Sequence, residues 1–330
     1  MESYQGGTSR SMVAVVVIIA VVASAYLFLA WDTPPGNPIP TIPTNPGPIN
    51  HTISNPIVIT SDAALLNMTI EQGWPGSGTY IDPFVIEGLR IVTDTRNCIK
   101  IHRVTEYYLT IRNCYFEATH LSFGVCVKIY ESANAVVENC TMVSGYQGMD
   151  FNGSSACEIR DCTISGVGCG INTTLASNIT VKRNVVSDCY LAMMIGGADH
   201  IRIWDNYFGA YDTGIWSYAS TDVILTNVTI TDNIVGLTTE YSCQNWTITE
   251  CLFINNTEVG IRLEATTQHF RIYSNRFGLN EMHAQDNGAS NLWDDGIGVG
   301  NAWADYSGIG VYTISGSAES VDNYPVLYAP

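Results

Sequence analysis

A motif of eight residues, in which apolar and polar positions alternate, recurs along this chain at a nearly fixed interval. Its copies cover residues 109–116, 135–142, 157–164, 179–186, 201–208, 223–230, 246–253 and 270–277. Their first residues are 26, 22, 22, 22, 22, 23 and 24 positions apart. Alternation with a period of two predicts a β-strand, and repetition every 20 to 50 residues or so is typical of a solenoid.

Two positions of the motif are apolar in every copy. The third position holds Ile111, Val137, Ile159, Val181, Ile203, Leu225, Ile248 and Ile272, and the eighth holds Phe116, Met142, Ile164, Val186, Phe208, Ile230, Phe253 and Phe277. Such columns predict side chains that point into one shared core. The sixth position is Cys114, Cys140, Cys162, Asn184, Asn206, Val228, Cys251 and Asn275. Small and amide side chains in register favour an inward corner, where amides can hydrogen-bond from coil to coil.

A second short strand follows each motif after a glycine, which Ala192 replaces in one coil. About 22 residues are too few for a strand–helix–strand unit, which needs roughly 30. The Leu-x-x-Leu-x-Leu signature of a leucine-rich repeat is absent from the sequence. We therefore predict an all-β fold, a single-stranded right-handed parallel β-helix of about 22–24 residues per coil, with coils stacked about 4.8 Å apart.

The N-terminal part of the chain predicts export. Residues 12–31 carry no charge and are long enough for a transmembrane helix. Arg10 precedes them, and the next Lys or Arg is Arg90, so residues 1–11 are expected in the cytoplasm and the remainder outside the cell membrane. Ala23-Ser24-Ala25 keeps open the alternative of a cleaved signal peptide and a secreted protein.

The composition divides the rest of the chain into segments. Residues 32–57 are rich in Pro and Thr and predict an extended stalk. Residues 58–97 are expected to form an N-terminal cap with the first strands, 98–280 the coils, and 281–330 a C-terminal cap.

The net charge of −17 excludes the basic surface that a nucleic-acid partner requires. Nine Asn-x-Ser/Thr sequons suit a glycosylated exterior, although Asn- and Thr-rich coils also produce them by chance.

Ten cysteines in an exported chain raise the question of disulfides. Cys114, Cys140, Cys162 and Cys251 fall in the inward column and Cys157 at an apolar first position, so packing as free thiols is favoured there. For the other five cysteines, which lie near turns and strand starts, the question of bridges stays open.

Both ends of the repeat carry distinctive segments. They are Gly73-Trp74-Pro75-Gly76-Ser77-Gly78-Thr79, Asp82-Pro83-Phe84-Val85-Ile86-Glu87-Gly88, Asn291-Leu292-Trp293-Asp294-Asp295-Gly296, Gly300-Asn301-Ala302-Trp303-Ala304-Asp305-Tyr306 and Asp322-Asn323-Tyr324-Pro325. With the coils, they resemble the NosD-like right-handed β-helix family, often found in archaeal surface proteins, within the carbohydrate-binding and sugar-hydrolase (CASH) group of the pectin-lyase-like superfamily. The resemblance implies either carbohydrate-related function or an accessory role in copper-site maturation. An Asp-Gly-rich insert frequent in relatives is missing here.

The outward positions of the second strand give the candidate functional residues. Asp150, Asn172, Trp216 and Tyr218 are candidate ligand-binding residues on one strip, because exposed aromatic rings suit sugar stacking. Glu240 and Glu264 lie one coil apart near Arg262, and two carboxylates about 5 Å apart suit retaining glycoside hydrolysis. The simpler interpretation is a solvated face on which Arg262 neutralises the two carboxylates.

Metal chemistry has weaker support in the sequence. Asp294, Asp295, Asn301 and Asp305 are candidate calcium ligands, although turn formation explains the same residue types. Copper is not favoured, because the six histidines are scattered and share no column of adjacent coils. We therefore expect no cofactor other than a calcium ion.

The sequence as a whole favours a membrane-anchored, non-catalytic extracellular β-helix that binds a glycan or a protein at the cell surface. A polysaccharide hydrolase or lyase and a NosD-like copper-handling accessory protein are the alternatives.

Overall fold

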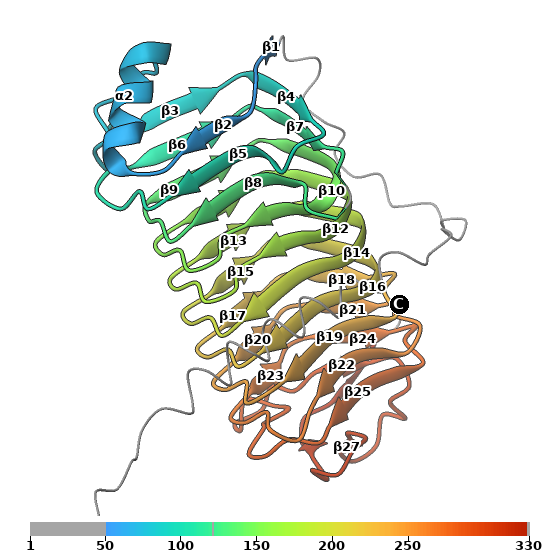
Figure 1. Cartoon of the computed structure of the whole chain (residues 1–330). Helices are drawn as coiled ribbons and strands as arrows, with labels where there is room; N and C mark the ends of the chain where they lie inside the picture. The colour runs from blue at the N-terminus through green and yellow to red at the C-terminus, as the bar shows by residue number, and fades with distance from the viewer. Residues whose placement is uncertain (1–50, 121, 329–330) are drawn as a thin grey trace, which may run out of the picture. The chain divides into compact units, whose positions relative to one another are not determined.

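The computed structural model describes residues 51–120 and 122–328, which belong to a compact unit spanning 45–330. Almost all of the strands in this unit are parallel to their neighbours. Figure 1 shows the strands stacked coil upon coil along one axis. The predicted all-β parallel β-helix is therefore confirmed. The predicted membrane helix at 12–31 lies outside the described residues, and within them no helix is long and apolar enough to span a bilayer.

One face of the solenoid is a nine-stranded sheet in strict sequence order. It comprises β3 (Phe84–Glu87), β6 (Leu109–Arg112), β9 (Ala135–Glu138), β11 (Glu158–Arg160), β13 (Thr180–Lys182), β15 (Arg202–Trp204), β17 (Ile224–Thr226), β20 (Thr247–Thr249) and β23 (Arg271–Tyr273). The third-position column of the repeat runs through it, with Ile159 paired to Val181 and Val181 to Ile203. The register is therefore the one that the sequence spacing predicted.

The remaining faces are formed by an eighteen-stranded sheet. Four central strands, β10 (Thr141–Asp150), β12 (Thr163–Asn172), β14 (Val185–Gly196) and β16 (Tyr207–Tyr218), run across both of these faces. Elsewhere each coil contributes two separate strands. These are β1 (Thr52–Ile53), β2 (Ile57–Ile59), β4 (Leu89–Thr93), β5 (Asn97–His102), β7 (Tyr115–Ala118), β8 (Val125–Tyr130), β18 (Thr229–Thr231), β19 (Val235–Glu240), β21 (Leu252–Ile254), β22 (Val259–Leu263), β24 (Arg276–Gly278), β25 (Met282–Asp286), β26 (Ala302–Trp303) and β29 (Val326–Leu327). A small antiparallel pair, β27 (Tyr312–Thr313) and β28 (Val321–Asp322), lies near the C-terminus.

The glycine that precedes the second strand is required by the stacking of the coils. At Gly214 an added Cβ would come 2.5 Å from the carbonyl oxygen of Gly236, and at Gly236 it would come 2.4 Å from that of Gly260. Such contacts are too short for any side chain. The glycine column therefore reflects the close approach of consecutive coils rather than a turn conformation.

The core lies inside the coils, where both apolar columns of the motif are fully buried. The sixth-position column also points inward. Asn184 donates from Nδ2 to Oδ1 of Asn206 (3.0 Å), and Asn275 does so to Asn301 (2.9 Å), which confirms the expected amide ladder. A second ladder, from Asn233 through Asn256 to Asn280, was not anticipated. All ten cysteines are buried free thiols, including the five whose pairing the sequence left open.

The two ends of the solenoid are closed differently. Helix α2 (Asp62–Gln72) lies at the N-terminal end, a helix that the sequence patterns did not predict (Figure 1). Ser61 caps it by accepting a hydrogen bond from the N–H of Ala64 (3.1 Å). At the C-terminal end two buried carboxylates accept hydrogen bonds from indole N–H groups, Asp286 from Trp293 and Asp322 from Trp303, both at 2.9 Å.

The observed ends of the solenoid differ from the segment bounds read from composition. Strand β1 and the first residue of β2 fall inside the segment 32–57 that was expected to be a stalk, because Thr52 and Ile53 pair with β4. Strand β25 falls inside the expected C-terminal cap, yet it pairs in register with β22 and continues the coils.

Candidate functional site

The candidate site is the outer face of the second strand in each coil, which we call the outer strip. In-register pairing places Lys128, Asp150, Asn172, Met194, Trp216, Thr238, Arg262 and Gln285 in one row along the solenoid. Tyr218 and Glu240 pair in the adjacent outer row, and Glu264 follows Leu263 at the matching position of the next coil. The structure therefore places the predicted binding residues in two adjacent rows, with Asp150 and Trp216 three coils apart.

The first part of the outer strip is not exposed as the sequence led us to expect. Asp150 and Asn172 are only 4% and 5% exposed. Lys128 forms an ion pair with Asp150 (Nζ–Oδ2, 2.7 Å), and Asn172 donates to the other carboxylate oxygen (3.2 Å). Thr174 then donates its N–H and its hydroxyl to Oδ1 of Asn172. These groups satisfy one another, so this part of the strip forms a closed hydrogen-bond network.

The aromatic pair lies in the middle of the outer strip. The rings of Trp216 and Tyr218 have centroids 5.3 Å apart and are inclined at 48°. Trp216 is partly exposed, whereas Tyr218 is 4% exposed, which corrects the expectation of two exposed rings. The Tyr218 ring lies across Gly196 of the preceding coil, where an added Cβ would come 2.2 Å from its Cζ. Its position therefore depends on the missing side chain of Gly196.

The hydroxyl group of Tyr218 has an unusual environment. Its oxygen is shielded from solvent, and no group of the described residues meets strict hydrogen-bond geometry with it. Burial raises the pKa of this phenol above its ordinary value, and hydrogen bonding with the nearby Thr174 side chain, at looser geometry, lowers it. The hydroxyl oxygen is shielded from solvent, so the outer strip does not offer it to a ligand.

The two candidate carboxylates, Glu240 and Glu264, are partly exposed and form no ion pair within the described part of the chain. Burial raises the pKa of the Glu240 carboxyl, a hydrogen bond with the Trp216 side chain lowers it, and the charge of Glu264 raises it. The expected neutralisation by Arg262 does not occur. Arg262 pairs instead with Glu258 and donates from Nε to Gln285 (3.2 Å).

The four candidate calcium ligands use their oxygen atoms within the protein. Asp294 accepts from the N–H and the amide of Asn323, and Asp295 accepts three backbone N–H groups of the turn that follows it. Asn301 lies in the interior ladder, and Asp305 accepts from the hydroxyl of Tyr312 (3.2 Å). These contacts agree with the turn-forming interpretation, and the structure does not bring the four side chains together as one ligand set.

Donors for a soft metal ion are also dispersed. Within residues 51–120 and 122–328, no group of three or more His, Cys, Asp or Glu side chains is arranged to hold a metal ion. His200 pairs with Asp199 and His102 with Glu131, and the cysteines are buried in the core. This donor set does not fit a resident copper ion.

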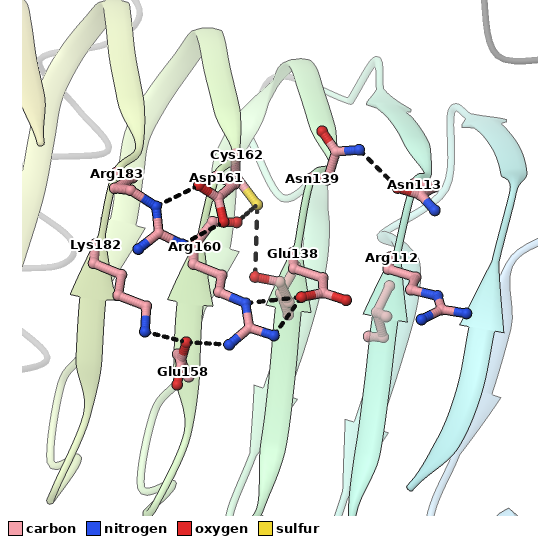
Figure 2. Close-up of polar contacts among 12 residues, drawn as sticks. Arg112, Asn113, Glu138, Asn139, Glu158, Arg160, Asp161, Cys162, Lys182 and Arg183 are labelled. Carbon is pink, nitrogen blue, oxygen red and sulfur yellow. Dashed lines mark hydrogen bonds and ion pairs between the residues drawn. The ribbon is translucent and has the colours of Figure 1, made fainter. Parts of the chain in front are cut away.

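A contrasting surface lies on the nine-stranded sheet, and the sequence analysis did not single it out. Figure 2 shows Arg160 between Glu138 and Glu158, with Lys182 on the other side of Glu158. The Arg160 Nε–Glu138 Oε2 distance is 2.8 Å and the Lys182 Nζ–Glu158 Oε1 distance is also 2.8 Å. Adding one repeat length to each charged position would have revealed this charge ladder, since oppositely charged residues recur about 22 positions apart.

The fold defines a parallel β-helix protein, and its second strands align outward side chains in rows along one long side of the coils. Residues 112–308, more than half of the chain, match the family described as periplasmic copper-binding protein (NosD), and the chain belongs to this family. Comparison with curated proteins finds no match.

Solved structures are similar to this chain at low sequence identity. The mannuronan C-5 epimerase AlgE6 A-module of Azotobacter vinelandii is 12% identical over 74% of this chain and 64% of its own, with a TM-score of 0.49. An alginate lyase from Paenibacillus is 9% identical over 81% of this chain and 99% of its own (TM-score 0.48). An exopolygalacturonase from Thermotoga maritima is 10% identical over 70% of this chain and 56% of its own (TM-score 0.44). This chain therefore spans less than two thirds of the epimerase module.

Proposed function

We propose that this protein is an exported, membrane-anchored β-helix that binds a glycan on its outer strip and does not cleave it. The observation that carries the proposal is the Trp216–Tyr218 pair beside the Glu240 carboxylate. An aromatic face with a polar group at its edge suits the apolar face and the hydroxyl groups of a sugar ring. The anchor is the uncharged segment 12–31.

The binding proposal is tested with a glycan array and a reducing-sugar assay on the same preparation. We expect specific retention of a glycan by the chain that begins at residue 51, with no release of reducing ends. If the protein binds no glycan, or if it binds equally well after Trp216→Ala, the proposal is wrong.

The membrane proposal has a separate test. We expect the full chain to sediment with membranes and the chain that begins at residue 51 to stay in solution. Recovery of the full chain in the soluble fraction would contradict the anchor and would leave the secreted alternative.

A second candidate, a retaining glycoside hydrolase, is favoured by one observation. The pKa of Glu240 is raised by burial, as the general acid of such an enzyme requires, and Glu264 lies one coil away, about 5 Å along the axis. However, both carboxylates project from the same row, on one side of any glycan lying on the strip. Release of reducing ends that Glu240→Gln abolishes would establish the hydrolase and overturn the non-catalytic proposal.

A further inference from the structure

The N-terminal end of the solenoid exposes large apolar side chains. The loop that follows helix α2 lies beyond the first strand of the nine-stranded sheet, because Val85 in β3 donates its N–H to the carbonyl oxygen of Pro75 (3.0 Å). Helix α2 and strand β1 lie at the same end (Figure 1). The exposed apolar side chains of these three segments, which we call the terminal face, are Ile53 (82%), Leu66 (38%), Ile70 (73%), Tyr80 (78%) and Ile81 (90%).

Helix α2 contributes apolar side chains on both of its faces. Leu65 and Thr69 are buried against the coils. Ala63, Leu66 and Ile70, three and four positions apart, project from the opposite face into solvent. A surface helix usually presents polar residues to water, so the two large aliphatic side chains indicate that this end of the solenoid has a partner.

The distribution of charge favours a lipid surface as that partner. Residues 51–112 contain five Lys or Arg and six Asp or Glu residues, so the N-terminal end is close to neutral. Residues 277–330, towards the opposite end, contain seven Asp or Glu and no Lys or Arg. A bilayer with anionic lipids attracts cations and repels carboxylates near its surface. Of the two ends, the N-terminal one is therefore better suited to lie against such a bilayer.

The N-terminal part of the chain leads to the same end. Nineteen residues, 32–50, separate the uncharged segment 12–31 from the first described residue. Even a fully extended segment of this length spans at most about 65 Å. With the proposed anchor in the bilayer, the tether holds the terminal face near lipid at a high effective concentration. Without the tether, the chain that begins at residue 51 should meet lipid too rarely to sediment with membranes.

We propose that the terminal face contacts the lipid bilayer and places Ile70, Tyr80 and Ile81 in the headgroup region. Tyrosine and aliphatic side chains suit this region, because the phenol keeps its hydroxyl group in water while its ring leaves it. The inference rests on the proposed membrane anchor and adds an orientation to it. The coils extend away from the bilayer, which leaves the outer strip open to ligands outside the cell.

The test uses the full chain reconstituted in vesicles of equal amounts of phosphatidylcholine and phosphatidylglycerol, with a fluorescence quencher on the lipid headgroups. All ten native cysteines are buried, so a single introduced cysteine can be labelled with a fluorophore. Ile81→Cys places the label on the terminal face. Ile309→Cys is the matched control, since Ile309 is 83% exposed and lies shortly before β27 at the opposite end (Figure 1). We expect quenching at position 81 and none at position 309.

A second measurement removes apolar contacts and keeps the tether. In the Ile81→Cys chain, Ile70→Ser combined with Tyr80→Ser should lower the equilibrium constant for docking about tenfold or more, observed as a loss of quenching. Ile297→Ser combined with Val326→Ser removes two exposed side chains from the C-terminal cap and should leave the quenching unchanged. All four native side chains are exposed, so urea unfolding should give nearly the same midpoint for both double variants.

The outcomes separate this inference from the anchor itself. Equal quenching at positions 81 and 309, or quenching at position 81 that survives Ile70→Ser with Tyr80→Ser, would overturn the docking and leave the anchor in place. A full chain that does not float with the vesicles would overturn both. If the chain that begins at residue 51 forms a dimer that the same two substitutions dissociate, the terminal face is an interface between copies and the docking is wrong.

Discussion

The charge ladder of the nine-stranded sheet and the outer strip both consist of outward side chains on stacked parallel strands. They differ in how their charged side chains are paired. In the charge ladder, Arg160 and Lys182 each lie next to a carboxylate of the same or an adjacent coil, and every charge has a partner (Figure 2). In the outer strip, Glu240 and Glu264 lie on adjacent coils, and neither forms an ion pair in the part of the chain that the structure describes. The outer strip also contains ion pairs, Lys128 with Asp150 and Arg262 with Glu258, but it leaves Glu240 and Glu264 without one. We therefore place the proposed ligand at this part of the outer strip.

The comparison depends first on the position of Tyr218, which Gly196→Ala would change. The new methyl group would overlap the tyrosine ring, whose Cζ is 2.2 Å from the ideal Cβ position. We expect a loss of about 2 kcal/mol in the free energy of unfolding, measured by urea denaturation. In a Tyr218→Ala background the same substitution should cost little, and an undiminished cost there would show that the ring does not occupy this place.

Trp216→Ala should reduce glycan affinity about tenfold, because it removes the aromatic face of the strip. A tenfold change corresponds to about 1.4 kcal/mol. Trp204→Ala is the matched control, since Trp204 lies outward on the nine-stranded sheet, where Lys182 approaches its ring (5.5 Å). If both variants lose affinity equally in calorimetry, the binding face is not the outer strip.

Arg160→Met should lower the free energy of unfolding by about 1 kcal/mol, because it leaves Glu138 without its cation in a partly buried ladder. Arg183→Met removes a more exposed pair with Asp161 and should cost less than about 0.5 kcal/mol. A larger loss for Arg183→Met than for Arg160→Met in thermal or urea unfolding would contradict this view of the ladder.

Glu240→Gln should have the smallest effect and the opposite sign, a gain of less than about 0.5 kcal/mol near neutral pH after allowance for solvent screening. The folded protein raises the pKa of Glu240, so ionisation favours the unfolded state, and this destabilisation develops as the pH rises above the unfolded value. The gain should therefore vanish at a pH below about 4, where the carboxyl is protonated in both states. Destabilisation by Glu240→Gln at neutral pH would show that the hydrogen bond with Trp216 outweighs the effects of burial and of the Glu264 charge.

Much of the fold could be predicted because the spacing of the repeat determines the register in which strands of adjacent coils pair. Residues about 22 positions apart stack on each other in adjacent coils. This spacing therefore predicts that Ile159 and Val181 are buried and that Asn184 and Asn206 form an amide ladder. The same spacing predicts that Trp216, Thr238 and Arg262 lie in one row, as they do. Helix α2 could not be predicted in this way, because it occurs once and lies outside the repeat.

The sequence alone determined the parallel β-helix and the direction in which most side chains of the strand motif point. It also determined the row on which the candidate site lies, because strands of successive coils pair in the register that the repeat spacing specifies. Tertiary structure decided which members of that row are available. Asp150 and Asn172 are buried in a closed network, the Tyr218 ring folds over Gly196, and Arg262 turns to Glu258 instead of the neighbouring carboxylates. Side-chain conformation and charge pairing depend on all neighbours in space, and a period along the chain specifies only which backbones are adjacent.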